Sequence, residues 1–297
     1  MRSGQFMGKN RKIFAYILAL ATLSGSVAAL GACEDPTVGN GVLVYELSED
    51  GDYYAVHGSG FFAEKQLVIP DTHNDLPVKE IADHAFRGNY FSSVVIGDSV
   101  EYIGEEAFYS CRNLTSVDMG ASVAEIGACA FASCGSLQGI TVDVANATYR
   151  SLDGNLYDVE GKTLLQYAVG KQAAAFVVPD TVETIAEKAF AGCLELRGVV
   201  VGTNVTLIEP SAFEPDVLSG SELDFGLEFF YYKGGEKAWR AVEVSEPNSR
   251  LAQKLYFYSE TEPEKSENGT AYDGQYWHYL EDEYGSYVPT PWTVEKE

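Results

Sequence analysis

One pattern occurs twice in succession, as VEYIGEEAFYSCRNLTSVDMGAS (residues 100–122) and as VAEIGACAFASCGSLQGITVD (residues 123–143). Corresponding residues are 23 positions apart: Ile103 and Ile126, Phe108 and Phe131, Cys111 and Cys134, and Leu114 and Leu137. A fixed period of roughly 20–50 residues is typical of solenoid proteins, whose repeats pack only against their neighbours. The pattern therefore predicts stacked repeats that share one continuous core.

Further copies lie on both sides. They are VKEIADHAF (residues 78–86), VETIAEKAFAGCLELRGVVV (residues 182–201) and VTLIEPSAF (residues 205–213), and from Ile81 the isoleucine advances by 22, 23, 59 and 23 residues. Strand alternation in LTSVDM points Leu114, Val117 and Met119 to the core and Asp118 outward. We therefore predict an α+β leucine-rich repeat solenoid over residues 64–225, with short stacked strands joined by short helical turns.

The 59-residue interval between Ile126 and Ile185 and the two ends of the chain depart from the repeat pattern. Residues 146–172 hold two apolar runs around a turn, which predict an inserted β-hairpin that projects from the array. Residues 42–63 predict a hairpin cap and residues 226–258 an aromatic cap of strands and a short helix, because open solenoid ends expose apolar side chains and strand edges. Residues 259–297 form an acidic linker, expected to be mobile, and an aromatic tail.

The first residues resemble a targeting segment. Residues 1–32 carry basic residues, then the short apolar run Ile13–Leu23 and small residues, which is the order of a secretory signal. The run is too short to span a bilayer comfortably. It ends Leu30-Gly31-Ala32-Cys33, which resembles the lipobox of bacterial lipoproteins and implies cleavage before Cys33, lipid on its thiol and a tether at residues 33–41. Simple secretion is the alternative.

The composition is strongly acidic. The chain has 20 Lys and Arg against 44 Asp and Glu, a net charge of −24. Without residues 1–32, which hold four basic and no acidic residues, the charge is 16 − 44 = −28. Such a field repels nucleic acid and anionic lipid, so we expect no nucleic-acid partner and contact with a membrane only through the lipid anchor.

Neither metal nor catalytic chemistry is indicated. Cys111, Cys134 and Cys193 share one repeat position and are expected to be buried thiols, with a Cys111–Cys134 disulfide as the alternative. No Cys/His spacing suits zinc, and the four histidines (His57, His73, His84 and His278) are scattered. We predict no metal, no cofactor and no enzyme, with an unrecognised secreted hydrolase as a remote alternative.

The repeats resemble the BspA-like leucine-rich repeat proteins of bacterial surfaces. The resemblance rests on V-x-x-I-G-x-x-A-F-x-x-C-x-x-L at steps of 22–23 residues, on DGNLYD (residues 153–158) with GKTLLQY (residues 161–167), and on YWHY (residues 276–279). It covers about residues 40–292. It implies a solenoid fold and a role in adhesion or protein contact, and it brings no catalytic residues.

Two surfaces are candidate sites. Outward strand positions form a β-branched stripe beside a row of small residues, and the stripe consists of Val68, Val95, Asp118, Thr141, Val177 and Val200. Such a face suits a protein partner, although strand propensity alone also explains these residue types. The tail aromatics Tyr276, Trp277, Tyr279 and Trp292 suit either stacking on sugars or capping the array, and we favour the cap.

These observations predict a lipid-anchored extracytoplasmic leucine-rich repeat protein that mediates protein–protein recognition or adhesion at the bacterial surface. A structural envelope scaffold without a dedicated ligand is the alternative. The two differ in the expected surface: a large exposed apolar sheet face favours recognition, and a uniformly polar surface favours the scaffold.

Overall fold

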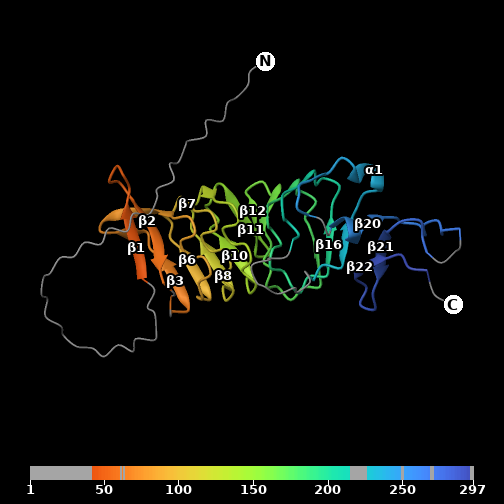
Figure 1. Ribbon diagram of the computed structural model, residues 1–297, viewed down its shortest axis with the longest axis horizontal. Coiled ribbons are helices and arrows are strands. Elements are labelled where there is room, and N and C mark those ends of the chain that lie inside the picture. Colours follow the sequence, from red (N-terminus) through yellow and green to blue (C-terminus); the bar gives the residue numbers. More distant parts are fainter. Residues whose placement is uncertain are drawn as a thin grey trace, which may run out of the picture. The chain divides into compact units, whose positions relative to one another are not determined.

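The repeats form a stack of parallel strands, one turn of chain above the next (Figure 1). This computed structural model describes residues 42–60, 62, 64–214, 226–248, 251–267 and 271–294. Most repeats contribute one strand of three or four residues and one of two residues. The inward side chains of both kinds of strand join a single hydrophobic core, so the predicted solenoid is confirmed.

The longer strands form two sheets, one on each side of the insertion. The N-terminal long-strand sheet contains β3 (Gln66–Ile69), β6 (Ser93–Ile96), β8 (Ser116–Met119) and β10 (Gly139–Val142), paired in parallel in that order. The C-terminal long-strand sheet contains β14 (Ala175–Val177), β16 (Gly198–Val201), β18 (Phe229–Tyr232), β20 (Leu255–Tyr258), β21 (Tyr276–Glu281) and β22 (Tyr287–Pro291).

The two-residue strands form a second pair of sheets. Before the insertion these strands are β7 (Tyr102–Ile103) and β9 (Glu125–Ile126), which follow β5 (Leu76–Ile81); β4 (Thr72–His73) also pairs with β5. After the insertion they are β15 (Thr184–Ile185), β17 (Leu207–Ile208) and β19 (Glu243–Val244). Their inward residues include Ile81, Ile103 and Ile185, which are fully buried.

The repeat pattern places identical residues above one another in the core. Val94, Val117 and Ile140 are aligned in register, and Val199 belongs to the same core. Phenylalanine rings stack from repeat to repeat, with centroids 5.4 Å apart for Phe86 and Phe108 and 5.3 Å apart for Phe108 and Phe131. Ring stacking adds to the burial of apolar area, which is the main favourable term in folding.

The helical turns predicted between the strands are wrong. In the described repeats these segments are hydrogen-bonded turns. The residue before each Ala-Phe pair has a φ between 50° and 59°; these residues are His84, Glu106, Cys129, Lys188 and Ser211. A left-handed residue interrupts a helix, and its N–H turns to the next repeat: the His84 N–H donates to Glu105 O at 2.8 Å and the Glu106 N–H to Ala128 O at 3.0 Å.

The repeated cysteines are buried thiols, as expected. Cys111 and Cys134 are free, and their Sγ atoms donate to the carbonyls of Phe86 (3.1 Å) and Phe108 (3.2 Å) in the preceding repeats. Burial raises the pKa of the Cys134 thiol well above its ordinary value. Cysteine suits this position because its side chain is small enough to fill the core and its S–H is a weak donor that satisfies a buried carbonyl.

The insertion does not project from the array, and that prediction is wrong. It consists of β11 (Tyr149–Leu152), β12 (Asn155–Asp158) and β13 (Thr163–Gln166). The β12 residues Leu156 and Tyr157 are buried, and β13 pairs in parallel with β15. The Ile140 N–H donates to Gly154 O at 2.9 Å, so the β11–β12 turn covers the edge of β10. Both β12 and β13 carry apolar side chains, and the removal of these side chains from water explains why the insertion packs into the core.

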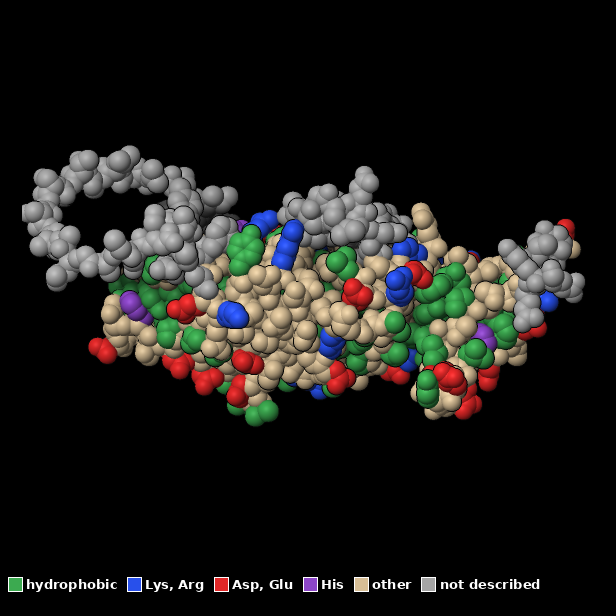
Figure 2. All heavy atoms as spheres, turned by 90° about the horizontal axis from the view of Figure 1, so that it is seen from below, with side chains coloured by type: hydrophobic (Ala, Val, Ile, Leu, Met, Phe, Trp, Pro, Cys, Tyr) green, Lys and Arg blue, Asp and Glu red, His purple; other side chains and the backbone are tan. Residues whose placement is uncertain are grey.

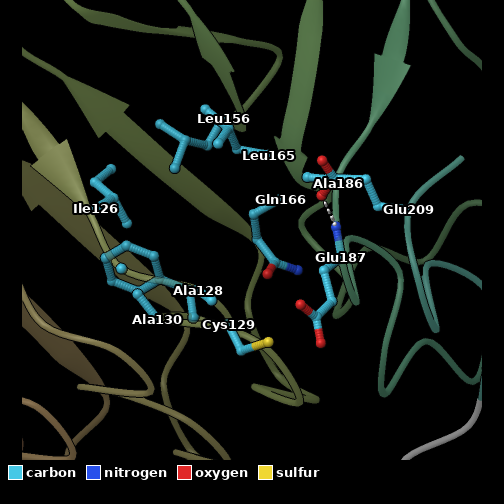
Figure 3. Close-up of a pocket in the computed structure, with 12 residues that line it drawn as sticks. Ile126, Ala128, Cys129, Ala130, Leu156, Leu165, Gln166, Ala186, Glu187 and Glu209 are labelled. Carbon is cyan, nitrogen blue, oxygen red and sulfur yellow. Dashed lines mark hydrogen bonds between the residues drawn. The ribbon is translucent and has the colours of Figure 1, made fainter. Parts of the chain in front are cut away.

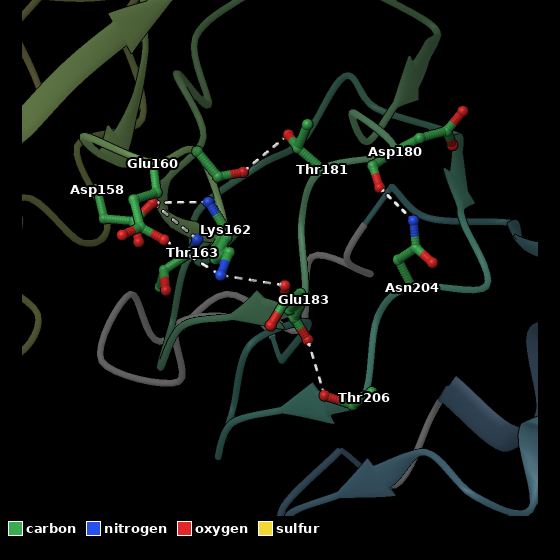
Figure 4. Close-up of polar contacts among 10 residues, drawn as sticks. Asp158, Glu160, Lys162, Thr163, Asp180, Thr181, Glu183, Asn204 and Thr206 are labelled. Carbon is green, nitrogen blue, oxygen red and sulfur yellow. Dashed lines mark hydrogen bonds and ion pairs between the residues drawn. The ribbon is translucent and has the colours of Figure 1, made fainter.

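Polar contacts link neighbouring turns of chain along the surface that follows the insertion (Figure 4). Asp158 Oδ1 accepts from the backbone N–H groups of Lys162 (2.7 Å) and Thr163 (3.0 Å), which closes the turn after β12. The Lys162 ammonium lies 3.1 Å from the Glu160 carboxylate and 3.6 Å from that of Glu183. These groups are exposed, and exposed ion pairs contribute little to stability.

Both ends of the stack carry hairpins. β1 (Val42–Leu47) and β2 (Tyr54–Ser59) are antiparallel, and β2 adds to the edge of β5. At the other end α1 (Glu236–Trp239) and the 3-10 helix η2 (Leu251–Lys254) connect the last strands, and β21 and β22 form an antiparallel pair beside β20. The aromatic tail is therefore part of the C-terminal long-strand sheet and does not form a separate element.

Candidate functional site

The predicted stripe is formed in the N-terminal half of the molecule. Val68 pairs with Val95, Val95 with Asp118, and Asp118 with Thr141, all on the outward face of the N-terminal long-strand sheet. Val68 is 50% exposed. The adjoining outward row is Gln66, Ser93, Ser116 and Gly139. Short side chains leave this face flat, which suits contact with another folded protein rather than enclosure of a small molecule.

The stripe does not continue across the whole solenoid. The turn of the β11–β12 hairpin lies beyond β10, and β14 pairs only with β16 among the described residues. Val177 is 47% exposed, but its neighbour Val200 is fully buried. Val200 packs with Tyr231 and Trp277, so it is not available to a partner and the predicted site loses this residue.

Aromatic side chains cover the outward face of the C-terminal long-strand sheet. We call this set the aromatic face; it consists of Phe229, Tyr231, Tyr256, Tyr258, Trp277 and Tyr279, packed with Val200. Burial raises the pKa of the Tyr231 hydroxyl above its ordinary range. Figure 2 shows hydrophobic side chains gathered toward this end of the molecule. The sequence signal is the alternation in LEFFYY and KLYFYSE, where every second residue faces outward.

Trp277 holds the aromatic face together. It is fully buried, and its indole N–H donates to Tyr232 O at 2.9 Å. Its ring lies 5.1 Å from Tyr231, 5.1 Å from Tyr258 and 5.0 Å from Tyr279, measured between centroids. The Trp277 ring is therefore not available for stacking on a sugar, whereas Tyr258 and Tyr279 remain partly exposed.

A groove opens beside Trp277, at the end of the aromatic face. It has a volume of about 470 Å³ and is lined by Tyr258, Glu260, His278, Tyr279 and Tyr287. The other two predicted tail aromatics do not line it: the Trp292 ring stacks on the ring of the lining residue His278 at 3.9 Å, and Tyr276 is half-buried. The groove combines apolar rings with a carboxylate and is a candidate ligand site.

A second cavity, of about 150 Å³, lies at the insertion. It forms because TLLQY (residues 163–167) runs from β13 directly to Tyr167 and lacks the turn that the other repeats have at this place. The turn of the preceding repeat therefore forms its hydrogen bond with the repeat after the insertion: the Ser133 N–H donates to Ala191 O at 3.3 Å. Cys129, Gln166 and Glu187 point into the space (Figure 3). The sequence predictions missed this cavity, although the absent turn was visible in the 59-residue step.

The cavity is not equipped for nucleophilic catalysis. Burial raises the pKa of the Cys129 thiol to about 12, and the nearby Lys188 opposes this only in part. A thiol with that pKa stays protonated near neutral pH, whereas the thiolate is the nucleophile. The Gln166 amide already donates to Tyr167 O (2.8 Å) and Ala189 O (3.0 Å), so it holds together the segments that contain Tyr167 and Ala189.

The scattered histidines have local roles. The His73 ring stacks on Tyr45 at 3.7 Å, and His84 Nδ1 lies 3.2 Å from the Glu106 carboxylate. Within the described ranges no group of three or more His, Cys, Asp or Glu side chains is placed to hold a metal ion. No helix in the part of the chain that the structure describes is long and apolar enough to cross a membrane. Cys33 lies outside the described residues.

Comparison with known proteins identifies the repeats. A family model described as a BspA type leucine-rich repeat region matches in six copies over residues 75–157 and 169–226. No curated protein matches the chain.

Several solved structures are similar at low identity. A leucine-rich cell surface protein of Faecalibacterium prausnitzii is 17% identical over 72% of this chain and 100% of its own, with a TM-score of 0.29. Leucine-rich repeat proteins of Eubacterium ventriosum (13% identity, 74% and 79% covered, TM-score 0.39) and T. pallidum (22% identity, 73% and 83% covered, TM-score 0.37) are also similar. The repeat assignment rests on the family model.

Proposed function

We propose that this chain, which belongs to the BspA-type leucine-rich repeat family, is a recognition protein of the bacterial surface that binds a protein partner through the outward face of its N-terminal long-strand sheet. The family supports recognition or adhesion in general. We propose in addition that the chain is anchored by lipid at Cys33.

The observation that carries this proposal is the exposed, flat stripe on that sheet. Val68 and Val95 are adjacent on it, and the next outward row begins with Gln66 and continues with the small residues Ser93, Ser116 and Gly139. An apolar centre that loses water on contact contributes affinity, and a flat surface permits close packing over a wide area. Asp118 and Thr141 continue the stripe with polar groups that suit the rim of an interface.

A double substitution tests this face. Val68→Lys with Val95→Lys places two charges at the apolar centre, and we expect binding to whole cells or extracted surface proteins to fall by at least about tenfold, because two desolvated charges oppose association. Val144→Lys is the matched control, since Val144 is fully exposed and lies after β10. Equal binding by the double variant and the control, with both folded, would remove this face from consideration.

The anchor has its own test. Cys33→Ser removes the thiol that would carry lipid, so we expect the variant to lose incorporation of an alkyne-labelled fatty acid and to leave the membrane fraction. Stable anchoring needs more than one acyl chain, so loss of the lipid carried by this thiol should be enough to release the chain from the membrane. Unchanged labelling and fractionation of the variant would contradict the proposed anchor.

A further inference from the structure

The groove at the C-terminal end differs from the flat stripe in both shape and chemistry. It is a concave site of about 470 Å³, within the range of small-molecule sites. We propose that this groove binds an uncharged saccharide chain, with Tyr258, Tyr279 and Tyr287 as the stacking surface and Glu260 as a hydroxyl acceptor. This site is independent of the protein-binding face proposed above.

The strand register brings the three tyrosines to one face. Tyr258 is aligned with Trp277 in the β20–β21 pair, and Tyr279 lies two residues further along β21 on the same side. In the β21–β22 pair Glu281 is opposite Tyr287, which places Tyr287 on that side too. Alternate residues of a strand share a face, so the tyrosines form a row across three neighbouring strands.

The floor of the groove is fixed before any ligand arrives. The buried Trp277 ring meets Tyr258 and Tyr279 at interplanar angles of 67° and 75°, which are edge-to-face contacts. Its N–H is bonded to Tyr232 O, so the indole cannot rotate without breaking that bond. A ligand therefore meets Tyr258 and Tyr279 rings that are already oriented, and little conformational entropy is lost at these two positions on binding.

The available groups match a saccharide. A pyranose ring presents C–H groups on its faces and hydroxyls on its rim, and the negative face of an aromatic ring attracts such C–H groups. Tyrosine hydroxyls both donate and accept hydrogen bonds, and an ionised carboxylate accepts them. Among the described residues no hydrogen bond occupies the hydroxyls of Tyr258, Tyr279 or Tyr287 or the Glu260 carboxylate, so all four groups remain for ligand hydroxyls.

The charge around the groove and the hydrogen-bond donors that remain free in it restrict the class of ligand. Glu260 lines the groove, Glu281 lies opposite Tyr287, and the chain carries a net charge of −24, so acidic sugars are repelled. A proline-rich peptide, which also docks in aromatic grooves, is the competing ligand. Both indole N–H groups at this end are already bonded to backbone carbonyls, Trp277 to Tyr232 and Trp292 to Ser259, so such a peptide would rely on the tyrosine hydroxyls as donors to its carbonyls.

The proposal is tested by calorimetric titration of the full chain with cellotetraose, maltotetraose, mannotetraose and tetra-N-acetylchitotetraose. We expect saturable binding of at least one, with saturation transfer from protein to the sugar C–H protons. Tyr287→Ala is the main variant, because Tyr287 is 69% exposed and its loss leaves the core intact. We expect about tenfold weaker binding for it, the scale of one aromatic contact.

Two further variants separate stacking from other effects. Tyr287→Phe keeps the ring, so we expect a loss of about threefold or less. Tyr284→Ala is the matched control: Tyr284 is 84% exposed in the β21–β22 turn, lies outside the groove, and its variant binds as the wild type does. The proposal is overturned by absence of binding to all four saccharides, by equal binding of the Tyr287→Ala variant, or by saturable binding of a polyproline peptide in their place.

Discussion

The two long-strand sheets share one fold and one register but present different outward faces. In the N-terminal sheet the outward positions hold Val68, Val95, Asp118 and Thr141, and the face is open. In the C-terminal sheet the same positions hold Val200 and then Tyr231 and Tyr256, and the face has its own apolar cluster. Inward positions are constrained by the shared core, so the outward positions alone are free to acquire different binding chemistry.

The largest expected difference is between lysine substitutions at equivalent positions. Val200→Lys places an unpaired charge where the side chain is fully buried, so we expect a loss of at least about 4 kcal/mol in the free energy of unfolding. Val68→Lys lies at a half-exposed position and should change that free energy by less than about 0.5 kcal/mol. Urea denaturation measures both, and similar losses would show that the two faces are equally covered.

Removing the indole of the aromatic face is the next test. Trp277→Ala deletes a fully buried ring and its hydrogen bond to Tyr232 O, so we expect a loss of about 3–5 kcal/mol in the free energy of unfolding. Trp292→Ala removes a partly buried ring and should have a smaller effect. Thermal denaturation followed by tryptophan fluorescence compares them. An equal loss for the two variants would mean that Trp277 does not organise this face.

We expect a smaller difference in stability between alanine substitutions at Gly139 and Gly198, which are the first residues of β10 and β16. A Cβ on Gly198 would lie 3.3 Å from Tyr231 Cε2, so Gly198→Ala must displace the ring and should cost about 1 kcal/mol. A Cβ on Gly139 would meet only the Gly154 Cα at 3.6 Å, so Gly139→Ala should be neutral or stabilising by about 0.5 kcal/mol. Denaturation midpoints of the two variants measure this contrast, and a stabilising Gly198→Ala would contradict the position of the Tyr231 ring.

The smallest effect concerns alkaline pH. Burial raises the pKa of Tyr231, so the folded protein favours the neutral phenol. Its contribution to stability is complete below about pH 10, the ordinary tyrosine pKa, and is lost as the pH rises further, because the unfolded state ionises first. Tyr231→Phe should therefore show a smaller decline in stability above pH 10 than the wild type. Identical declines would place Tyr231 in solvent.

The repeat frame was predictable because the core requires it. A fixed spacing of Ile103, Phe108 and Leu114 in successive repeats fixes the stack, and no long-range information is needed. The turns were not predictable as non-helical, since the left-handed residue is histidine, glutamate, cysteine, lysine or serine at different repeats, and these types share no common signal for positive φ.

The candidate sites were predictable only in part. Val68 and Val95 follow from alternation alone, whereas the burial of Val200 depends on Tyr231 and Trp277, which are distant in sequence. The sequence predicts a hairpin within residues 146–172, where the structure has β11, β12 and β13, but its orientation depends on the packing of Leu156 and Tyr157 in the core. The groove requires three strands to meet, and two of these, β21 and β22, lie in the tail, for which the sequence offered capping or sugar stacking but no strand pairing.

Cysteine accessibility separates the two faces most directly. Single substitutions Val68→Cys and Val200→Cys put a thiol at equivalent outward positions, and a maleimide reports how often each meets solvent. We predict that Val68→Cys reacts within minutes in the folded protein and that Val200→Cys reacts only on unfolding. Equal rates of labelling in two folded variants would contradict the claim that aromatic side chains cover one face and leave the other open.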